Sequence, residues 1–320
     1  MRRRSWVVPA LVLCALAVPS LGTTSGAEIV WRTTLWDGRE RAFGLYVPVE
    51  AASSAPLVFL LHGGGGSATR TWNQEHGRSW KALADEHGFI LVLPEGRADL
   101  GDPESHHWND CRTDLEEETM ASTEDDVGFI ASLIETVSAL APIDPDRVYV
   151  TGASNGGMMT YRLAIELSNR FAAVAAIIAN LAAPSECGPP VSPIPILIMN
   201  GTDDRLIPFD GGCVATTRCE RGRVMSTAET VSRWVEANRA SSEPTVVKLP
   251  NRSWFDGSTV TVYTFSGEDG GADVVYYHIA GGGHTVPGFE STSLLRRSMD
   301  GTKNRDIDGP TKIWAFFRQH

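Results

Sequence analysis

The 320-residue chain is predicted to form a single α/β domain, with a mostly parallel central sheet and helices on both faces. Short runs that are apolar at every position, such as Pro56–Leu61 and Phe89–Leu93, are typical of strands buried on both faces of a parallel sheet. Such runs alternate along the chain with helical segments such as Thr227–Asn238, and this alternation favours a sheet covered by helices. No internal repeat or long linker marks a second domain.

The expected strands are short runs that are either wholly apolar or alternate between apolar and polar residues. In chain order they are Val30–Thr34, Ala42–Val47, Pro56–Leu61, Phe89–Leu93, Arg147–Thr151, Ala172–Ile178, Ile194–Met199, Val260–Phe265 and Val274–Ile279. The dipeptide Asp37-Gly38 lies between the first two strands and is typical of a tight hairpin turn. The sheet is therefore expected to begin with an antiparallel pair.

The expected helices have recognisable start and stop signals. They are Trp80–His87, Asp125 to about Leu140, Asn155–Asn169, Thr227–Asn238 and about Pro310–Arg318. Gly88 is suited to end the first, and Pro310 is suited to the first position of the last. Acidic side chains at Asp125 and Asp126 are favourable at a helix N-terminus.

Residues 1–27 are expected to be a signal peptide, cleaved near residue 22 or 27, which leaves one domain over residues 28–320. Arg2, Arg3 and Arg4 form a basic start, and the apolar run Trp6–Val18 is too short to span a bilayer. We therefore expect a secreted protein without an integral membrane span. The net charge of −11 makes a nucleic-acid partner unfavourable because such a chain repels phosphates.

Cysteine use agrees with export. Beyond Cys14, the chain has Cys111, Cys187, Cys213 and Cys219, and an even number in an oxidising compartment indicates two disulfides. Three connectivities are open. Cys213 and Cys219 are near enough in sequence to close one loop, which would leave Cys111 with Cys187. No paired-cysteine or cysteine–histidine spacing indicates a metal, and we expect no metal site.

A nucleophilic serine is the sharpest functional signal. Gly152-Ala153-Ser154-Asn155-Gly156-Gly157 follows the expected strand Arg147–Thr151 and opens an expected helix. A GxSxG motif between a strand and a helix is typical of the nucleophile elbow of the α/β-hydrolase fold. The motif therefore predicts that fold, with Ser154 as the nucleophile and the N–H of Asn155 as one oxyanion donor.

A serine nucleophile needs a base, and the base needs an orienting acid. In α/β hydrolases the acid and then the histidine follow the serine along the chain. His284 comes after the expected strand Val274–Ile279 and fits as the base, because the other histidines precede the serine, lie within a strand or are terminal. Asp203 and Asp204 both follow the strand Ile194–Met199, and position alone does not separate them as the acid.

The glycine run after His62 predicts the second oxyanion donor. Gly63, Gly64, Gly65 and Gly66 directly follow a buried strand, and glycines let a backbone N–H approach a substrate closely. Because triad and oxyanion hole are complete without any added group, we expect no cofactor.

The segment Asp99–Asp126 carries eleven acidic residues and one basic residue, Arg112. A calcium or other metal site is one alternative for this segment, and a solvated loop is the prediction. Since it follows the strand Phe89–Leu93, it should emerge at the same sheet edge as Ser154. We therefore expect Trp108 and Asn109 to line the substrate cleft, with the alternative that Trp108 anchors the loop in the core.

With these residues placed, the chain resembles the secreted α/β-hydrolase esterases that include single-domain polyhydroxybutyrate depolymerases, feruloyl esterases and acetylxylan esterases. The resemblance covers almost all of the chain after the signal peptide. It lies in Leu61-His62-Gly63-Gly64, Trp108-Asn109-Asp110, Asp125–Phe129, Asn200–Pro208 and Gly282–Gly288. The match implies Gly64 as the second oxyanion donor and Asp204 as the catalytic acid, and it supports His284 as the base. Two positions depart from the resemblance: Asn200 stands where the family often has histidine, and Val286 replaces its usual tryptophan.

The resemblance implies a secreted serine carboxylic-ester hydrolase that works through an acyl-enzyme. Its partner would be an ester substrate, either a hydroxyalkanoate oligomer or an acylated polysaccharide. Two alternatives remain open: a serine peptidase of the same fold, and a cell-surface binding protein without catalysis.

Overall fold

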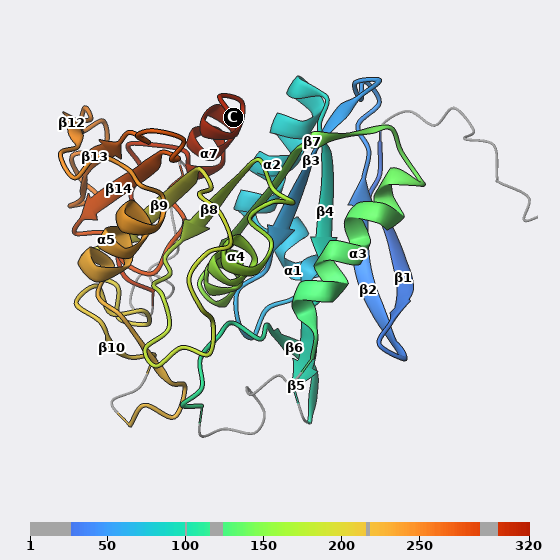
Figure 1. Ribbon diagram of the computed structural model, residues 1–320, viewed down its shortest axis with the longest axis horizontal. Helices are drawn as coiled ribbons and strands as arrows, with labels where there is room; N and C mark the ends of the chain where they lie inside the picture. The colour runs from blue at the N-terminus through green and yellow to red at the C-terminus, as the bar shows by residue number, and fades with distance from the viewer. Residues whose placement is uncertain (1–26, 100, 116–123, 216–217, 289–299) are drawn as a thin grey trace, which may run out of the picture.

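A computed structural model of the chain describes residues 27–99, 101–115, 124–215, 218–288 and 300–320 (Figure 1). All but one residue of the expected signal peptide lie outside these ranges. Within them, one ten-stranded sheet has the order β1-β2-β4-β3-β7-β8-β9-β14-β13-β12. Its strands are β1 (Val30–Trp36), β2 (Arg39–Tyr46), β3 (Ala55–Leu61), β4 (Ile90–Pro94), β7 (Ile143–Ala153), β8 (Ala173–Ile177), β9 (Ile196–Gly201), β12 (Thr245–Lys248), β13 (Thr259–Phe265) and β14 (Val274–Ala280).

The centre of the sheet is parallel and its two ends are antiparallel. Strands β4, β3, β7, β8, β9 and β14 pair in parallel, each with its neighbour. The pair β1–β2 extends one end and β13–β12 extends the other, all antiparallel. The α/β fold class predicted from the sequence is therefore confirmed, including the hairpin at Asp37-Gly38.

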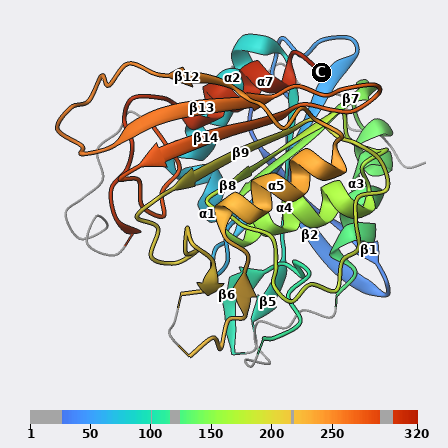
Figure 2. The same ribbon diagram turned by 60° about the vertical axis from the view of Figure 1, so that its left-hand side comes forward.

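Helices cover both faces, as Figure 2 shows. Their bounds are α1 (Ala68–Asn73), α2 (Glu75–His87), α3 (Asp126–Ser138), α4 (Asn155–Glu166), α5 (Thr227–Ala237) and α7 (Gly309–Phe317). Helices α3, α4 and α5 bury Phe129, Met159 and Trp234 in the core on one face. On the other face α2 and α7 contribute Trp80 and Trp314 to a second core. The sheet thus has an apolar layer on each side, as its continuous apolar strands require.

The structure differs from the expectations in several elements, among them α1 and the edge strand β12, which were not expected. Helix α2 begins at Glu75, five residues earlier than expected, and α1 directly precedes it. Ser67 caps α1 by accepting a hydrogen bond from the Arg70 N–H at 3.1 Å, a signal that is easily hidden in a glycine-rich stretch. Part of the acidic segment forms the hairpin β5 (Arg97–Asp99) and β6 (Asp102–His107).

Two disulfides join Cys111 to Cys187 and Cys213 to Cys219. This is the pairing expected if the two nearby cysteines close one loop. The first disulfide fastens the segment after β6 to the segment after β8, and the second closes a loop between β10 (Gly212–Cys213) and β11 (Arg223–Val224). Among the described residues, no helix has the length and apolar character needed to cross a membrane.

Candidate active site

Ser154 occupies a sharp turn between the end of β7 and the start of α4. Its φ of 59° and ψ of −125° lie in a region that L-residues rarely adopt, and such strain is typical of functional turns. The turn needs small neighbours: a Cβ at Gly152 would lie 2.4 Å from the Gly156 carbonyl oxygen. The backbone of the elbow therefore has the conformation that the GxSxG motif predicts, with Ser154 on the wall of a large cavity.

His284 and Asp204 form a hydrogen-bonded pair beside the same cavity. The Nδ1 of His284 lies 2.8 Å from Oδ2 of Asp204. The other carboxylate oxygen of Asp204 accepts the N–H groups of Leu206 and Ile207, each at 2.8 Å. Because both oxygens are held, the carboxylate is fixed in orientation. Its acceptance of the Nδ1 proton leaves Nε2 of His284 as the basic nitrogen.

The structure distinguishes Asp203 from Asp204, which their positions in the sequence do not. Asp203 is exposed, and its carboxylate accepts a hydrogen bond from its neighbour Thr202 at 2.9 Å. Asp204 is buried and bonded to His284. The side chain of Asn200, at the carboxyl end of β9, accepts a hydrogen bond from the Ala179 N–H and donates one to the Ala179 carbonyl. These bonds connect the end of β9 to the segment after β8. Asn200 therefore has a structural place, and Asp204 is the aspartate that contacts the histidine.

Two backbone N–H groups are available beside Ser154. Asn155 is the first residue of α4, and N–H groups in the first turn of a helix have no acceptor within the helix. A Cβ built on Gly64 would lie 3.2 Å from the Cβ of Asn155, so the glycine loop passes close to this helix end. Gly65 and Gly66 donate their N–H groups within the fold, whereas none of the described residues accepts the N–H of Gly64. The N–H groups of Gly64 and Asn155 are therefore candidate donors for an oxyanion hole.

The glycine loop is held by His62, which the sequence marked only as an unsuitable base. His62 is buried, its Nδ1 donates to the Gly63 carbonyl at 2.9 Å, and its Nε2 accepts the Gly96 N–H at 2.9 Å. Burial lowers the pKa of His62 to about 3, so the ring is neutral at physiological pH. His62 therefore joins the loop to the segment after β4 as an uncharged brace.

Trp108 does not line the cavity, contrary to the expectation from the sequence. Its ring is 1% exposed, lies in the core, and donates from Nε1 to the His62 carbonyl at 2.9 Å. Asn109 is also absent from the cavity wall, and its N–H donates to Asp126 at 2.9 Å. Both residues support the loops around Ser154 from behind. The physical reason is that Trp108 packs in the core with its ring against that of His62, at a centroid distance of 4.7 Å, which the sequence does not reveal.

A buried polar network fixes the residue next to the serine. Asn155 accepts the Trp108 N–H at 2.8 Å through its side-chain oxygen and donates its amide to Asp110 at 2.6 Å. Asp110 also receives two hydrogen bonds from the guanidinium of Arg112, at 2.8 and 2.7 Å. Sequence reasoning missed this network, although an aspartate and an arginine two residues apart beside a cysteine were a visible signal. The first residue of helix α4 is thereby anchored at the cavity wall.

The candidate site opens into a cavity of about 920 Å³. Its wall includes Ser154, Asn155, His284 and Gly64, so the structure brings these four expected residues together. His107 and Val286 also contribute to the wall. A space of this size holds a drug-sized molecule or several units of an oligomer.

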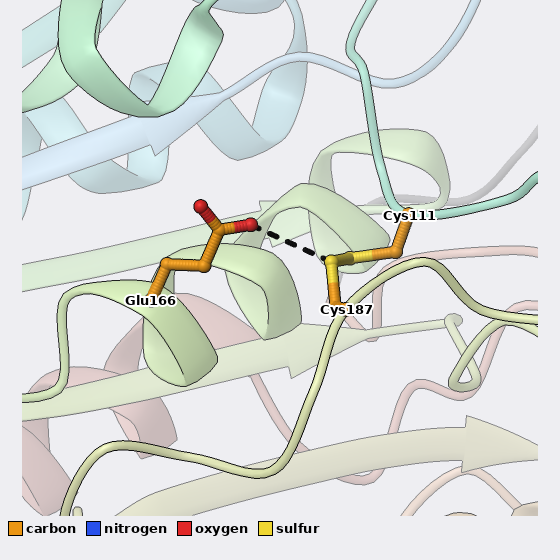
Figure 3. A group of neighbouring side chains, drawn as sticks. All are labelled: Cys111, Glu166 and Cys187. Atoms are coloured by element: carbon orange, nitrogen blue, oxygen red, sulfur yellow. Dashed lines mark hydrogen bonds between the residues drawn. A yellow bond between two sulfur atoms is a disulfide. The ribbon is translucent and has the colours of Figure 1, made fainter.

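One group of side chains has the composition of a metal site: Cys111, Glu166 and Cys187 (Figure 3). The two sulfur atoms are bonded to each other, so neither can offer the thiolate that a metal ion requires. Glu166 lies 3.5 Å from Cys187 Sγ and pairs with Arg162 at 2.8 Å. The cluster is therefore a disulfide with a neighbouring salt bridge.

Comparison with known sequences gives a consistent picture. The profile of a family described as Esterase PHB depolymerase matches residues 41–185. The "Putative esterase NocK" of Nocardia uniformis subsp. tsuyamanensis is 33% identical over 296 residues, covering 89% of this chain and 80% of the relative. The "Bifunctional acetylxylan esterase/xylanase XynS20E" of Neocallimastix patriciarum is 25% identical over 277 residues. That alignment covers 85% of this chain but 34% of the longer relative.

Solved structures show the same fold. An acetyl xylan esterase from Aspergillus awamori matches with a TM-score of 0.54 and 16% identity, over 84% of this chain and 97% of that one. The esterase PE8 matches with a TM-score of 0.52 and 18% identity, over 86% and 96% of the two chains. At this level of identity the likeness establishes the α/β-hydrolase architecture.

Proposed function

Because the chain belongs to the esterase family of the PHB depolymerases and is a carboxylic ester hydrolase, we propose that Ser154 is its nucleophile. The observation that carries this proposal is the shared wall of one cavity. Ser154, in a strained elbow, lies on that wall with a histidine whose Nδ1 is held by a buried carboxylate. Serine, histidine and acid in this relation form the triad of acyl-transfer enzymes.

In the acylation step, the Ser154 hydroxyl attacks the ester carbonyl carbon while Nε2 of His284 takes its proton. The carbonyl oxygen becomes negative and is stabilised by the N–H groups of Asn155 and Gly64. The carbon–oxygen bond to the alcohol then breaks, and His284 returns the proton to the departing alcohol. Asp204 stabilises the imidazolium through its 2.8 Å bond to Nδ1.

In the second step, water replaces the alcohol. His284 takes a proton from this water, and the resulting hydroxide attacks the acyl carbon of the Ser154 ester. The tetrahedral intermediate uses the same two N–H donors. Collapse releases the carboxylic acid and returns the proton to Ser154, so each cycle consumes one ester and one water.

The proposed substrates are hydroxyalkanoate oligomers or acyl groups carried by polysaccharides, and the proposed location is outside the cell. The names of relatives that act on acetylated xylan, feruloyl esters or poly(3-hydroxyalkanoate) support this range of esters. The two disulfides support an oxidising compartment. A panel of short nitrophenyl esters, hydroxybutyrate oligomers, and acetylated and feruloylated xylan tests the substrate range.

The nucleophile is tested by labelling and by replacement. We expect a fluorophosphonate probe to label the wild-type protein at Ser154, with the adduct located by peptide mass spectrometry. The Ser154→Ala variant should not be labelled, and its hydrolysis of p-nitrophenyl acetate should fall by at least about 10⁴-fold. A Ser132→Ala variant, changed on α3 away from the cavity wall, serves as the control. Full turnover by a folded Ser154→Ala protein would reject the assignment.

The peptidase and binding-protein alternatives have distinct outcomes in the same assays. A peptidase would be labelled by the probe and would cleave a peptide panel as well as activated esters. A binding protein would be neither labelled nor active. Labelling at Ser154 with release of acid from an ester excludes the binding protein, and an intact peptide panel excludes the peptidase.

A further inference from the structure

The cavity wall is basic although the chain is acidic. The whole sequence has 39 acidic and 28 basic residues, not counting histidine. Among the described residues that line the cavity, the balance is reversed, with five basic side chains and two acidic ones. The basic residues are Arg70, Arg78, Arg112, Arg221 and Lys303, and the acidic residues are Glu75 and Asp300.

Some of these charges are neutralised in pairs. Arg112 is bound by both oxygens of Asp110, and Lys303 is bonded to Glu75. Asp300 lies on the His284 side of the cavity, where its backbone carbonyl accepts the His284 N–H at 2.6 Å. The cavity wall formed by the glycine loop and α1 carries Arg70, which has no ion-pair partner among the described residues.

Arg70 is the central residue of that wall. It is exposed at the last turn of α1, and its Nη1 donates to the carbonyl oxygen of Gly65 at 2.8 Å. This bond places the guanidinium against the glycine loop that supplies the proposed oxyanion donor. A guanidinium has five N–H donors in a planar fork, so donors remain for a second oxygen ligand. A carboxylate is the ligand that such a fork recognises in two-point fashion.

The N-terminus of α2 adds to the same field. Gln74 precedes the helix without a side-chain cap, and Gln74, Glu75, His76 and Arg78 all line the cavity. The first N–H groups of a helix carry a partial positive charge that favours anions. The Nε2 of His76, in the first turn of this helix, is buried without a partner among the described residues.

We propose that this wall, with Arg70 at its centre, selects esters that carry a free carboxylate group. This inference rests on the proposed function and narrows its substrate class. Oligomers of hydroxy acids have this chemistry, because each ends in a carboxylate on the alcohol side of its last ester bond. Monoesters of dicarboxylic acids have the carboxylate on the acyl side. Acetyl groups on neutral sugars lack it.

Two matched pairs of substrates isolate the charge. One pair is the 3-hydroxybutyrate dimer and its terminal carboxamide, and the other is monomethyl adipate and its terminal carboxamide. Within each pair the shape is kept while the negative charge is removed. The measurement is kcat/KM for each ester at low ionic strength, expressed as the ratio of acid to amide for the wild-type protein and for three variants.

We expect the ratio to exceed one for at least one pair. Arg70→Gln should lower that ratio about five-fold, the effect of an exposed ion pair of about 1 kcal/mol, and mainly through KM. Arg70→Lys keeps the charge and should retain most of the preference. Arg170→Gln, which removes an exposed arginine paired with Glu135 away from the cavity wall, should leave the ratio unchanged.

The outcomes separate this inference from the function on which it rests. If neutral esters are hydrolysed but Arg70→Gln leaves both ratios at their wild-type values, the carboxylate preference is overturned and the esterase stands. If the protein hydrolyses none of the four substrates and no nitrophenyl ester, both are overturned. A ratio that falls with Arg70→Gln and with added salt supports the inference, because salt screens exposed charges.

Discussion

Two regions meet at the candidate site and are built on different principles. The strand-end loops carry Ser154, Asp204 and His284, and each of these residues follows its strand within a few positions. The bracing segment, residues 95–99 and 101–112, supplies no proposed catalytic group but contacts the loops through Gly96, Trp108 and Asp110. The comparison teaches that the strand ends place the proposed catalytic residues locally. The rigidity of the loops that carry them depends on contacts between distant parts of the chain.

Replacing Asp204 tests the strand-end loops most severely. In Asp204→Asn, the amide N–H₂ would face Nδ1 of His284 and favour the tautomer with its proton on Nε2, which cannot accept the serine proton. We expect kcat to fall by about 10⁴-fold with little change in thermal stability. Asp203→Asn is the matched control and should keep wild-type kcat. Equal losses in the two variants would show that Asp204 is not the orienting acid.

Replacing Trp108 tests the bracing segment. Trp108→Ala removes a fully buried ring, and we expect the free energy of unfolding to drop by about 3–5 kcal/mol in urea denaturation. Trp108→Phe keeps most of the apolar volume and loses the bond to His62, which should cost about 1 kcal/mol. If Trp108→Ala has unchanged stability and a raised KM for bulky esters, Trp108 contacts the substrate and is not a core residue.

Gly64→Ala acts where the two regions touch. The new Cβ would lie 2.8 Å from Cδ2 of His107 and 3.2 Å from the Cβ of Asn155, so the glycine loop must shift. Displacing one oxyanion donor should lower kcat by about 10²-fold with a smaller effect on KM. Gly188→Ala, which adds a methyl group in open space, provides the control. Wild-type kcat in Gly64→Ala would exclude this part of the loop from the oxyanion hole.

The smallest expected effect is a change in the free energy of unfolding with pH that is caused by His62. Burial lowers the pKa of His62 to about 3, below the ordinary value of 6.5 that applies after unfolding. Between these values the unfolded chain binds a proton that the folded chain does not, so stability falls as pH falls. The slope from this group is about 1.4 kcal/mol per pH unit.

His62→Asn should remove that slope. The measurement is the free energy of unfolding in urea at pH 6.0 and 5.0 for the variant and the wild-type protein. The wild-type protein should lose more stability between the two pH values than the variant, by about 1 kcal/mol. Parallel pH dependences would mean that the His62 ring takes up its proton equally in both states.

The parts that the sequence could predict are those with local signals. The apolar runs gave the parallel strands because a doubly buried strand needs no polar positions. The elbow around Ser154 could be predicted because its turn requires small residues at fixed spacing. Two cysteines only six residues apart, Cys213 and Cys219, made the disulfide pairing a natural expectation.

The parts that could not be predicted depend on distant partners. Trp108 bonds to His62 through its ring and to Asn155 through its backbone N–H, 46 and 47 residues away, and nothing near it in the sequence indicates these contacts. The same holds for the burial of Asp110, which depends on Asn155 as well as on nearby Arg112. From the sequence alone, an aromatic residue in a polar loop therefore resembles a substrate-binding residue. Its role in the core becomes visible only when its distant packing partners are known.

The disulfide between Cys111 and Cys187 has a topological consequence. The two cysteines are 76 residues apart, and the chain between them contains α3, β7, Ser154 and α4. The proposed nucleophile therefore belongs to a closed covalent ring. A protease that cuts once within this ring linearises it but separates no fragment, so a nicked molecule keeps both halves of the chain joined around the elbow.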